Sequence, residues 1–391
     1  MMIQPSQMDP ISLIIWFVIG ILFFLFGPRL MYQQSMMKLE KDTEELEGVA
    51  EKSRGYVIKS LKGKATPKVK ESIKSFMDFF AISPIETDPY GVIKKIDHIV
   101  RNSDERFKYF VDQIAPNASQ ADKRDIKNAL EGAMLTHQIA KVVRHYLETI
   151  KKYKMYQMAM IIQMQIPLIA RISKAAMHAT KAFIEAIPIG DGIGPLVVTT
   201  LIKEKPQVFS EEEFVIARTR INGRDVWIAK AEGPGASTGY PGKFLIKFFK
   251  KHRINRLITI DAALRLEGEK TGSIAEGVGV AMGGTGVDRY EIEEITVKRN
   301  IPLDAIAVKV SDEEALMPMK KDIFDSVPDA IEAIKENLKR AKKNENILII
   351  GVGNTCGIGN TFESIKNAEK KLREHHRKAV EKKKSIITIK K

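Results

Sequence analysis

ILIIGVGN, residues 347–354, is an apolar run that ends in a glycine turn, which is typical of a buried strand. Two similar runs precede it, LITIDAAL (257–264) and LDAIAVKV (303–310), and a helical pattern, FDSVPDAIEAIKENLKRAKK (324–343), leads into it. Strands that alternate with helices predict a three-layer α/β/α sandwich with a mainly parallel sheet over residues 187–360. Sites in such folds lie at the carboxyl ends of strands, so the loops that follow strands are the places to look for chemistry.

The loop GVGNTCGIGN (351–360) has to be tested first as a nucleotide-binding loop. Cys356 stands where a dinucleotide-binding glycine motif needs glycine, and too little chain follows to complete a βαβ unit. No GxxxxGK[ST] motif occurs either. The sequence therefore gives no support to a nucleotide site.

Two carboxylates stand beside strand ends or glycine turns. Asp261 ends the apolar strand LITID, where an unpaired carboxylate is unfavourable, so it either caps the next segment, pairs with Arg265 or is catalytic. Asp191 lies in GDGIGP (190–195), before a helix whose amides could bind an anion and which Asp191 could simply cap. If the two carboxylates converge, they form an acid pair that holds one proton between its members.

The N-terminal sequence predicts a membrane anchor. ISLIIWFVIGILFFLFG (11–27) is uncharged and about as long as the shortest bilayer-spanning helices, and the apolar character extends to residue 32. A cleaved signal peptide is the alternative, but no basic segment precedes the run and no small-x-small cleavage site follows it. Basic residues begin at Arg29, whereas residues 1–10 contain none, so we expect a single-pass protein of the cell membrane with its N-terminus outside and its remainder cytoplasmic.

The expected organisation is an N-terminal tail (1–10), a transmembrane helix (11–32), a helical domain (36–186), the α/β domain (187–360) and a basic C-terminal helix and tail (361–391). Much of the methionine lies in residues 152–187. Methionine at helical spacing indicates core packing, although a flexible binding groove has the same composition.

Residues 226–310 resemble the spore germination protease family in the order and spacing of their motifs. The matching positions are Pro234, Gly235, Thr238, Gly239, Asp261, Ala262, Gly283, Gly284, Gly286 and Val287. The hydrogenase maturation proteases share this fold, and in both groups a strand ending in Gly-x-Gly-Asn precedes an acidic residue in a Gly-Pro-containing turn. Here the two pieces occur in reverse order, because the Asp191 turn begins the domain and the Asn354 strand ends it. The resemblance thus implies a circularly permuted phosphorylase/hydrolase-like fold, with the last strand inserted beside the strand of Asp261.

The same resemblance implies an aspartic-type endopeptidase in which Asp191 and Asp261 activate water for amide hydrolysis, since both match that family's catalytic aspartates. Supporting or substrate-binding positions would be Glu276, Gly284, Asp288, Arg289 and Asn354. Asn354 and the neighbouring amides are candidate oxyanion donors, while Asp288 and Arg289 could hold a peptide terminus or form only a surface ion pair. The whole chain, with its anchor, is similar to an archaeal membrane-protein family of unknown function.

Composition narrows the classes of partner. One cysteine, Cys356, excludes an internal disulfide and fits a reducing compartment, and the seven scattered histidines show no zinc-ligand spacing, so neither a metal nor a cofactor is expected. Residues 361–391 hold 11 Lys or Arg against 4 Glu, a net charge of +7, with Phe362 as the one aromatic residue. Such a segment predicts contact with anionic headgroups, or only a solvated helix face, and no specific nucleic-acid binding.

The expected partners are therefore a peptide or protein substrate and the membrane, and the sequence leaves the oligomeric state open. Two other functions fit the same residues. One is a different hydrolase or a phosphorylase on this scaffold, and the other is a non-catalytic membrane adaptor.

Overall fold

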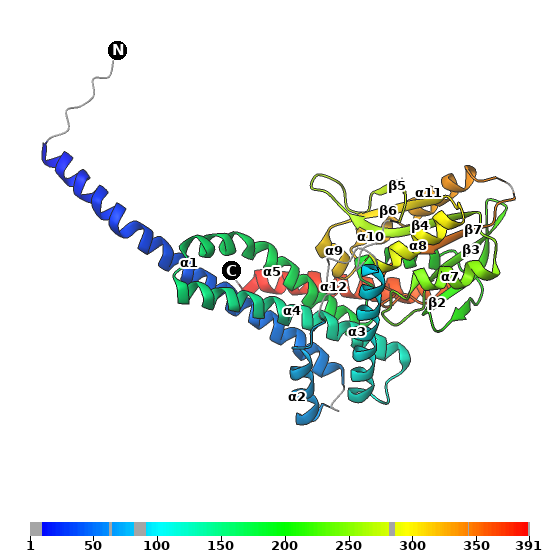
Figure 1. Cartoon of the computed structure of the whole chain (residues 1–391), viewed down its shortest axis with the longest axis horizontal. Helices are drawn as coiled ribbons and strands as arrows, with labels where there is room; N and C mark the ends of the chain where they lie inside the picture. Colours follow the sequence, from blue (N-terminus) through cyan, green and yellow to red (C-terminus); the bar gives the residue numbers. More distant parts are fainter. Residues whose placement is uncertain (1–9, 62–64, 82–90, 281–285, 343, 390–391) are drawn as a thin grey trace, which may run out of the picture.

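The computed structural model describes residues 10–61, 65–81, 91–280, 286–342 and 344–389. Figure 1 shows a long N-terminal helix, a helical region alongside its second part, and an α/β region beyond that. The helices of the first half are α1 (Pro10–Ser60), α2 (Pro67–Phe76), α3 (Val92–Ile114), α4 (Gln120–Tyr153) and α5 (Tyr156–Glu185).

The expected anchor and the first helix of the helical region form one continuous helix, α1. Of the described helices, α1 alone is long and apolar enough to cross a membrane, by length and composition. Its second part packs against α4 and α5 through buried leucines and isoleucines such as Leu46 and Leu147. The expectation of core packing for the methionines of α5 is wrong in part, because Met160 and Met164 are 56% and 77% exposed.

The second half contains seven strands and the helices between them. In chain order these are η1 (Gly190–Gly192), α6 (Ile193–Thr199), β1 (Gln207–Phe209), β2 (Phe214–Ile221), β3 (Arg224–Ala231), α7 (Pro241–Lys251), β4 (Arg256–Leu264), β5 (Ile274–Val278), α8 (Val287–Lys298), β6 (Leu303–Val310), α9 (Asp312–Leu316), α10 (Lys321–Asp325), α11 (Val327–Lys339), β7 (Ile347–Gly351), η2 (Phe362–Ser364) and α12 (Ile365–Ile389).

The sheet is mixed rather than mainly parallel, with strand order β1-β2-β3-β7-β4-β6-β5. The central strands β3, β7, β4 and β6 are parallel, whereas β1, β2 and β5 pair antiparallel at the two edges. A tight turn explains one edge, because Asn222 and Gly223 both adopt positive φ (50° and 77°) and reverse the chain between β2 and β3. The fold is therefore α/β with a parallel centre and antiparallel margins.

The last strand, β7, lies at the centre of the sheet, between β3 and β4, as the sequence argument requires. Ile349 stands opposite Ile228 on one side and Ile258 on the other. Ile347 and Ile349 face an apolar cluster that includes α6 and α11, while Leu348 and Ile350 face a second cluster with α7 and α8. Helices thus cover both faces, and the loops after β3, β4 and β7 meet at one end of the sheet.

Helix α12 runs back from the α/β region along the helical region, and Figure 1 places the C-terminus there. Leu372 is buried in the same cluster that contains α4 and α6 residues, and the Lys371 ammonium donates to the carbonyl of Ala186 at 3.0 Å. The first part of the basic segment is therefore packed structure rather than a free tail.

Candidate active site

Asp191 reaches the strand ends because glycines let its segment lie directly on them. Gly353 has φ +127°, and a Cβ there would lie 2.0 Å from the carbonyl oxygen of Asp191. At Gly194 a Cβ would lie 2.2 Å from the carbonyl oxygen of Val352 and 2.3 Å from that of Ile260. The GDGIGP turn and the GVGN turn are thus in direct backbone contact, which side chains at these positions would prevent.

The two carboxylates predicted to form a pair lie close enough to influence each other. Asp261 is 4% exposed, and its Oδ1 accepts a hydrogen bond from the amide of Ala262 at 2.7 Å. Asp191 is half-buried, and its Oδ2 accepts from the amide of Asn354 at 2.8 Å. Burial raises the pKa of Asp191, and burial together with the charge of Asp191 raises the pKa of Asp261 well above its ordinary value.

Asn354 holds Asp191 in place and is not a free oxyanion donor. Its backbone amide is used by Asp191, its Oδ1 accepts from the amide of Cys356 at 2.9 Å, and its Nδ2 donates to Oδ1 of Asn128 at 3.2 Å. The next amide, that of Thr355, donates to the carbonyl of Ser237 at 3.0 Å. The expected oxyanion role of Asn354 is therefore replaced by a positioning role.

The alternative interpretations of the two aspartates do not fit the geometry. Helix α6 begins at Ile193, its N-cap residue is Gly192 and no side chain caps it, so Asp191 does not cap it. Arg265 approaches Glu314 at 3.9 Å instead of pairing with Asp261. A nucleophilic role for Cys356 also fails, because the thiol is fully buried and burial raises its pKa well above the ordinary value, which keeps it protonated.

Two other predicted site residues lie elsewhere. Glu276 is exposed on edge strand β5 and pairs with Arg340 at 3.3 Å, so it does not tune the pair. Arg289 is exposed on α8 and forms a surface ion pair at 2.9 Å with Glu293 rather than with Asp288.

Asp288 lies in the first turn of α8 and accepts from the amide of Gly242 at 3.1 Å, which joins α8 to the start of α7. This contact gives Asp288 a structural role. Gly284 lies outside the described residues.

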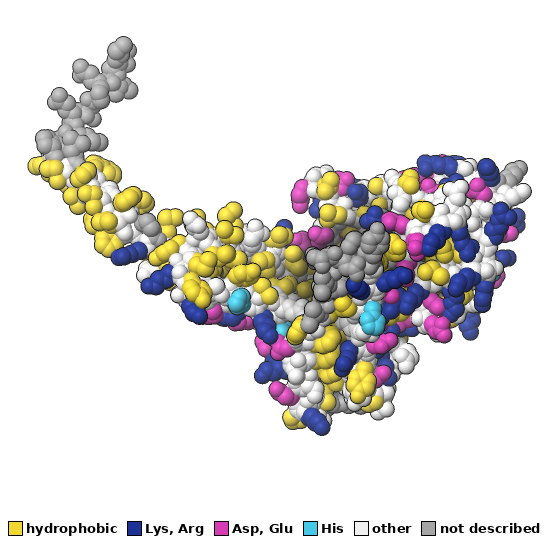
Figure 2. All heavy atoms as spheres, viewed as in Figure 1, with side chains coloured by type: hydrophobic (Ala, Val, Ile, Leu, Met, Phe, Trp, Pro, Cys, Tyr) yellow, Lys and Arg dark blue, Asp and Glu magenta, His cyan; other side chains and the backbone are white. Residues whose placement is uncertain are grey.

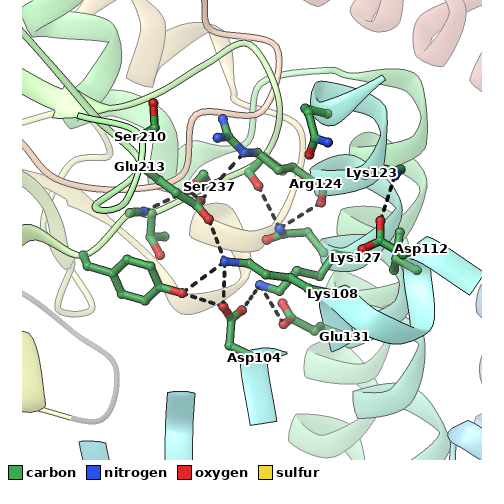
Figure 3. A pocket seen from close by; sticks show the side chains of 17 residues that line it. Asp104, Lys108, Asp112, Lys123, Arg124, Lys127, Glu131, Ser210, Glu213 and Ser237 are labelled. Atoms are coloured by element: carbon green, nitrogen blue, oxygen red, sulfur yellow. Dashed lines mark hydrogen bonds and ion pairs between the residues drawn. The ribbon is translucent and has the colours of Figure 1, made fainter. Parts of the chain in front are cut away.

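A polar pocket of about 530 Å³ lies between α3, α4 and the loop 236–240, and Figure 3 shows its lining. Its charged residues are four cations, Lys108, Lys123, Arg124 and Lys127, and four carboxylates, Asp104, Asp112, Glu131 and Glu213. Lys108 donates to Glu213 at 2.7 Å, and Lys127 contacts Asp104 at 2.6 Å. Burial opposes the ionised form of Asp104, but Lys127 and Lys108 outweigh it and lower its pKa to about 2.

Hydrogen bonds through the side-chain amides of Asn128 and Asn354 connect the pocket to the segment that holds Asp191. Asn128 lines the pocket, donates to the carbonyl of Ala236 at 2.9 Å and accepts from Asn354, which in turn holds Asp191. Sequence reasoning missed this pocket, because its charges alternate along α3 and α4 as they do on any solvated helix.

Two buried ionisable residues near the site were also missed. The ammonium of Lys230 is fully buried, burial lowers its pKa to about 7, and it donates to Oδ1 of Asn360 at 2.9 Å. Asp125 of α4 is 8% exposed and accepts from the amide of Ala236 at 2.8 Å, and burial raises its pKa to about 7. The sequence did contain a signal for Lys230, because lysines are rarely buried and this one stands within the apolar run VWIAKA.

Family comparisons match nearly the whole chain. Residues 13–186 match the N-terminal domain of a protein of unknown function, DUF1512, and residues 189–359 match the DUF1512 C-terminal domain of unknown function. The chain belongs to the DUF1512 family. No curated protein matches it, and no solved structure does. Neither match supports the resemblance of this DUF1512 protein to the germination proteases, which stays a proposal.

The two DUF1512 domains meet between α5 and η1, yet both contribute to the site. Asn128 and Asp125 belong to the N-terminal domain, and their hydrogen-bond partners Asn354 and Ala236 belong to the C-terminal domain. Within the described residues, no group of three or more His, Cys, Asp or Glu could hold a metal ion.

Proposed function

We propose that this DUF1512 protein is a membrane-anchored hydrolase that cleaves amide bonds in a peptide or protein, with Asp191 and Asp261 as its acid–base pair. The observation that carries the proposal is the proximity of two carboxylates: Asp191 lies in a turn packed on the loop after β7, and its charge raises the pKa of Asp261 in the neighbouring strand β4. In the described part of the chain neither carboxylate pairs with a cation. Burying unpaired carboxylates destabilises the fold, and such strain is concentrated at functional sites. A non-catalytic adaptor would gain nothing from this destabilising arrangement.

The chemistry follows from which carboxyl group holds the proton. In this mechanism Asp261 keeps it, since Asp261 is the more buried of the two and both burial and the charge of Asp191 raise its pKa well above the ordinary value. The backbone amides do not distinguish the two carboxylates, because each accepts one hydrogen bond from an amide. Asp191 takes a proton from water as the water oxygen bonds to the scissile carbonyl carbon, and Asp261 gives its proton to the carbonyl oxygen. The proton on Asp191 then passes to the leaving nitrogen, the carbon–nitrogen bond breaks, and Asp261 recovers its proton from the collapsing diol.

The resemblance to the germination proteases supports the proposal that Asp191 and Asp261 are the catalytic pair, because β7 lies beside β4 as a permuted chain of that type requires. The pocket beside Asn128 is the proposed place for substrate side chains, since it adjoins the residues that hold Asp191. Helix α1 is the proposed single-pass anchor in the cell membrane, with the N-terminus outside and the pair on the cytoplasmic side.

The proposal is tested by incubating the full chain in detergent micelles with denatured casein and with a mixture of quenched fluorogenic peptides. We expect Asp191→Asn and Asp261→Asn each to lower the cleavage rate by roughly 100-fold or more, because each removes one proton carrier. The matched control is Glu276→Gln, which neutralises a carboxylate on edge strand β5 and should keep the parent rate. Circular dichroism checks that all three variants fold.

Two results would contradict the proposal. One is parental activity in either aspartate variant. The other is a folded parent that cuts neither casein nor any peptide at any pH at which it stays folded, since the singly protonated form of a coupled pair is then either absent or inactive.

A further inference from the structure

The tip of the α4–α5 hairpin lies where the apolar part of α1 ends. The ring of Tyr32 in α1 contacts the ring of Tyr156 at the start of α5, with centroids 4.4 Å apart. Helix α5 then continues beside the second part of α1, with Ala159 and Ile166 buried between the helices. If α1 spans a bilayer, this contact puts the hairpin tip at the bilayer surface.

The tip exposes a set of large apolar side chains. These are Tyr153 (63% exposed), Met155 (39%), Tyr156 (48%), Met160 (56%) and Ile161 (55%). Figure 2 shows apolar side chains continuing from α1 onto the adjoining helical region. Exposed Lys151, Lys152 and Lys154 flank the set, and of these Lys151 also contacts Glu40 of α1 at 2.8 Å. Single exposed apolar residues are ordinary, but a contiguous set with aromatic and basic neighbours marks an interaction surface.

We propose that this tip, residues 151–161, inserts into the headgroup layer of the bilayer that α1 crosses. Tyrosines prefer that layer because the ring is apolar while the hydroxyl forms hydrogen bonds with water, and lysines extend their ammonium groups to anionic headgroups. Tyr153, Met155 and Tyr156 at the turn between α4 and α5 lie nearest the acyl chains, and Met160 and Ile161 lie one turn further along α5, on the headgroup side. The inference rests on the anchoring role of α1 in the proposed function, not on the hydrolytic chemistry.

A lipid surface fits the tip better than a second copy of the chain. In a symmetric dimer the same patch is buried from both copies, so two positively charged surfaces would be brought together and the tip would supply no counter-charge for Lys152 and Lys154. Anionic headgroups supply the opposite charge, and each lysine near them contributes about 1 kcal/mol before screening.

A second point of attachment would fix the height of the active site above the membrane. A single helix allows the attached region to swing, whereas α1 and the tip together hold α5 in one orientation. Helix α5 has 30 residues and leads directly to the Asp191 turn. At 1.5 Å per residue it spans about 45 Å, so the substrate bond would lie up to that far from the bilayer surface.

The experiment uses spin labels on the full chain in nanodiscs that contain anionic lipid. Labels are placed one at a time by Tyr153→Cys and, at a second tip position, Met155→Cys, since both side chains are exposed at the turn between α4 and α5. Leu22→Cys reports on α1 and Val297→Cys, which is 79% exposed on α8, reports on water. The native Cys356 is fully buried and does not compete for the label.

Collisions with oxygen, which concentrates in lipid, are compared with collisions with a water-soluble nickel complex. We expect an oxygen-to-nickel ratio at residues 153 and 155 that is at least about tenfold above that at residue 297, as for groups seated at the acyl boundary. A ratio at both tip positions equal to that at residue 297, with residue 22 in lipid, overturns the inference and leaves the anchor intact. A water-like ratio at residue 22 overturns the anchor itself. Shielding from both reagents with dipolar broadening at the tip assigns the surface to a second copy and also overturns the inference.

Discussion

Asp125 gives the sharpest quantitative test of the interface between the two DUF1512 domains. Its carboxyl group is 8% exposed and accepts from the amide of Ala236, and burial raises its pKa from about 3.8 to about 7. Between these two values the folded protein holds a proton that the unfolded chain has lost, so stability falls as pH rises through this window and is level above it. The pKa difference of about 3 units corresponds to roughly 4 kcal/mol in the free energy of unfolding.

The substitution Asp125→Asn removes this titration and keeps an oxygen that accepts from Ala236. We therefore expect the stability of the variant relative to the parent to increase by roughly 4 kcal/mol between about pH 4 and about pH 7.5. Urea unfolding of the full chain in detergent micelles, followed by circular dichroism, measures this difference. Other titrating groups act equally on parent and variant and cancel when the two curves are subtracted.

Asp125→Ala is the matched control, because it removes both the charge and the hydrogen-bond acceptor. It should show the same loss of pH dependence but lie about 1–3 kcal/mol below Asp125→Asn at every pH, since the amide of Ala236 is then buried without a partner. Parallel pH curves for the parent and Asp125→Asn would refute the assignment of the raised pKa to this carboxyl group.

Two further predictions concern the strand and the turn that build the site. Ile349→Ala, on central strand β7, should lower the free energy of unfolding by about 2–5 kcal/mol because the side chain is fully buried. Val278→Ala, on edge strand β5, should change it by less than about 0.5 kcal/mol because that side chain is 89% exposed. Equal urea midpoints for the two variants would argue against a central position of β7. Gly353→Ala should displace the Asp191 turn, because the added Cβ would meet the Asp191 carbonyl. Gly223→Ala is the control: it is also at positive φ but in open space, and it should lower the free energy of unfolding by about 1 kcal/mol. A Gly353→Ala variant no less stable than Gly223→Ala would rule out the close approach of the two turns.

The central strands were predictable because each is a short, apolar, β-branched run bounded by turns. The runs at 257–264, 303–310 and 347–354 all became strands, and the last one entered the middle of the sheet. The direction of the edge pairing was not predicted. β1 has three residues and β5 contains Gly277, so neither has a strong strand pattern, although the Asn-Gly pair before β3 was a legible hairpin signal.

The carboxylates could be found from the sequence, but the groups that hold them could not. Asp191 and Asp261 each stand beside a glycine turn or a strand end, and such positions meet in an α/β fold. That Asn354 holds Asp191 through its main chain depends on the conformation of Gly353, which only the packed structure sets. In the pocket Lys108 pairs with Glu213, which is 105 residues away, and the spacing of charges along a helix does not predict such a long-range contact.

The helical region does more than connect the α/β region to an anchor. Asn128 and Asp125 hold the backbone of the Ala236 loop and the side chain of Asn354 from the far side of the boundary between the two domains. One apolar cluster also crosses that boundary, with Leu130 of α4 and Leu196 of α6 in it. Because the groups that position Asp191 come from both domains, separating them would leave the two carboxylates without part of their support. The N-terminal helices and the site of the proposed chemistry are thus parts of one structural unit, and a contact that orients the helices also orients the site.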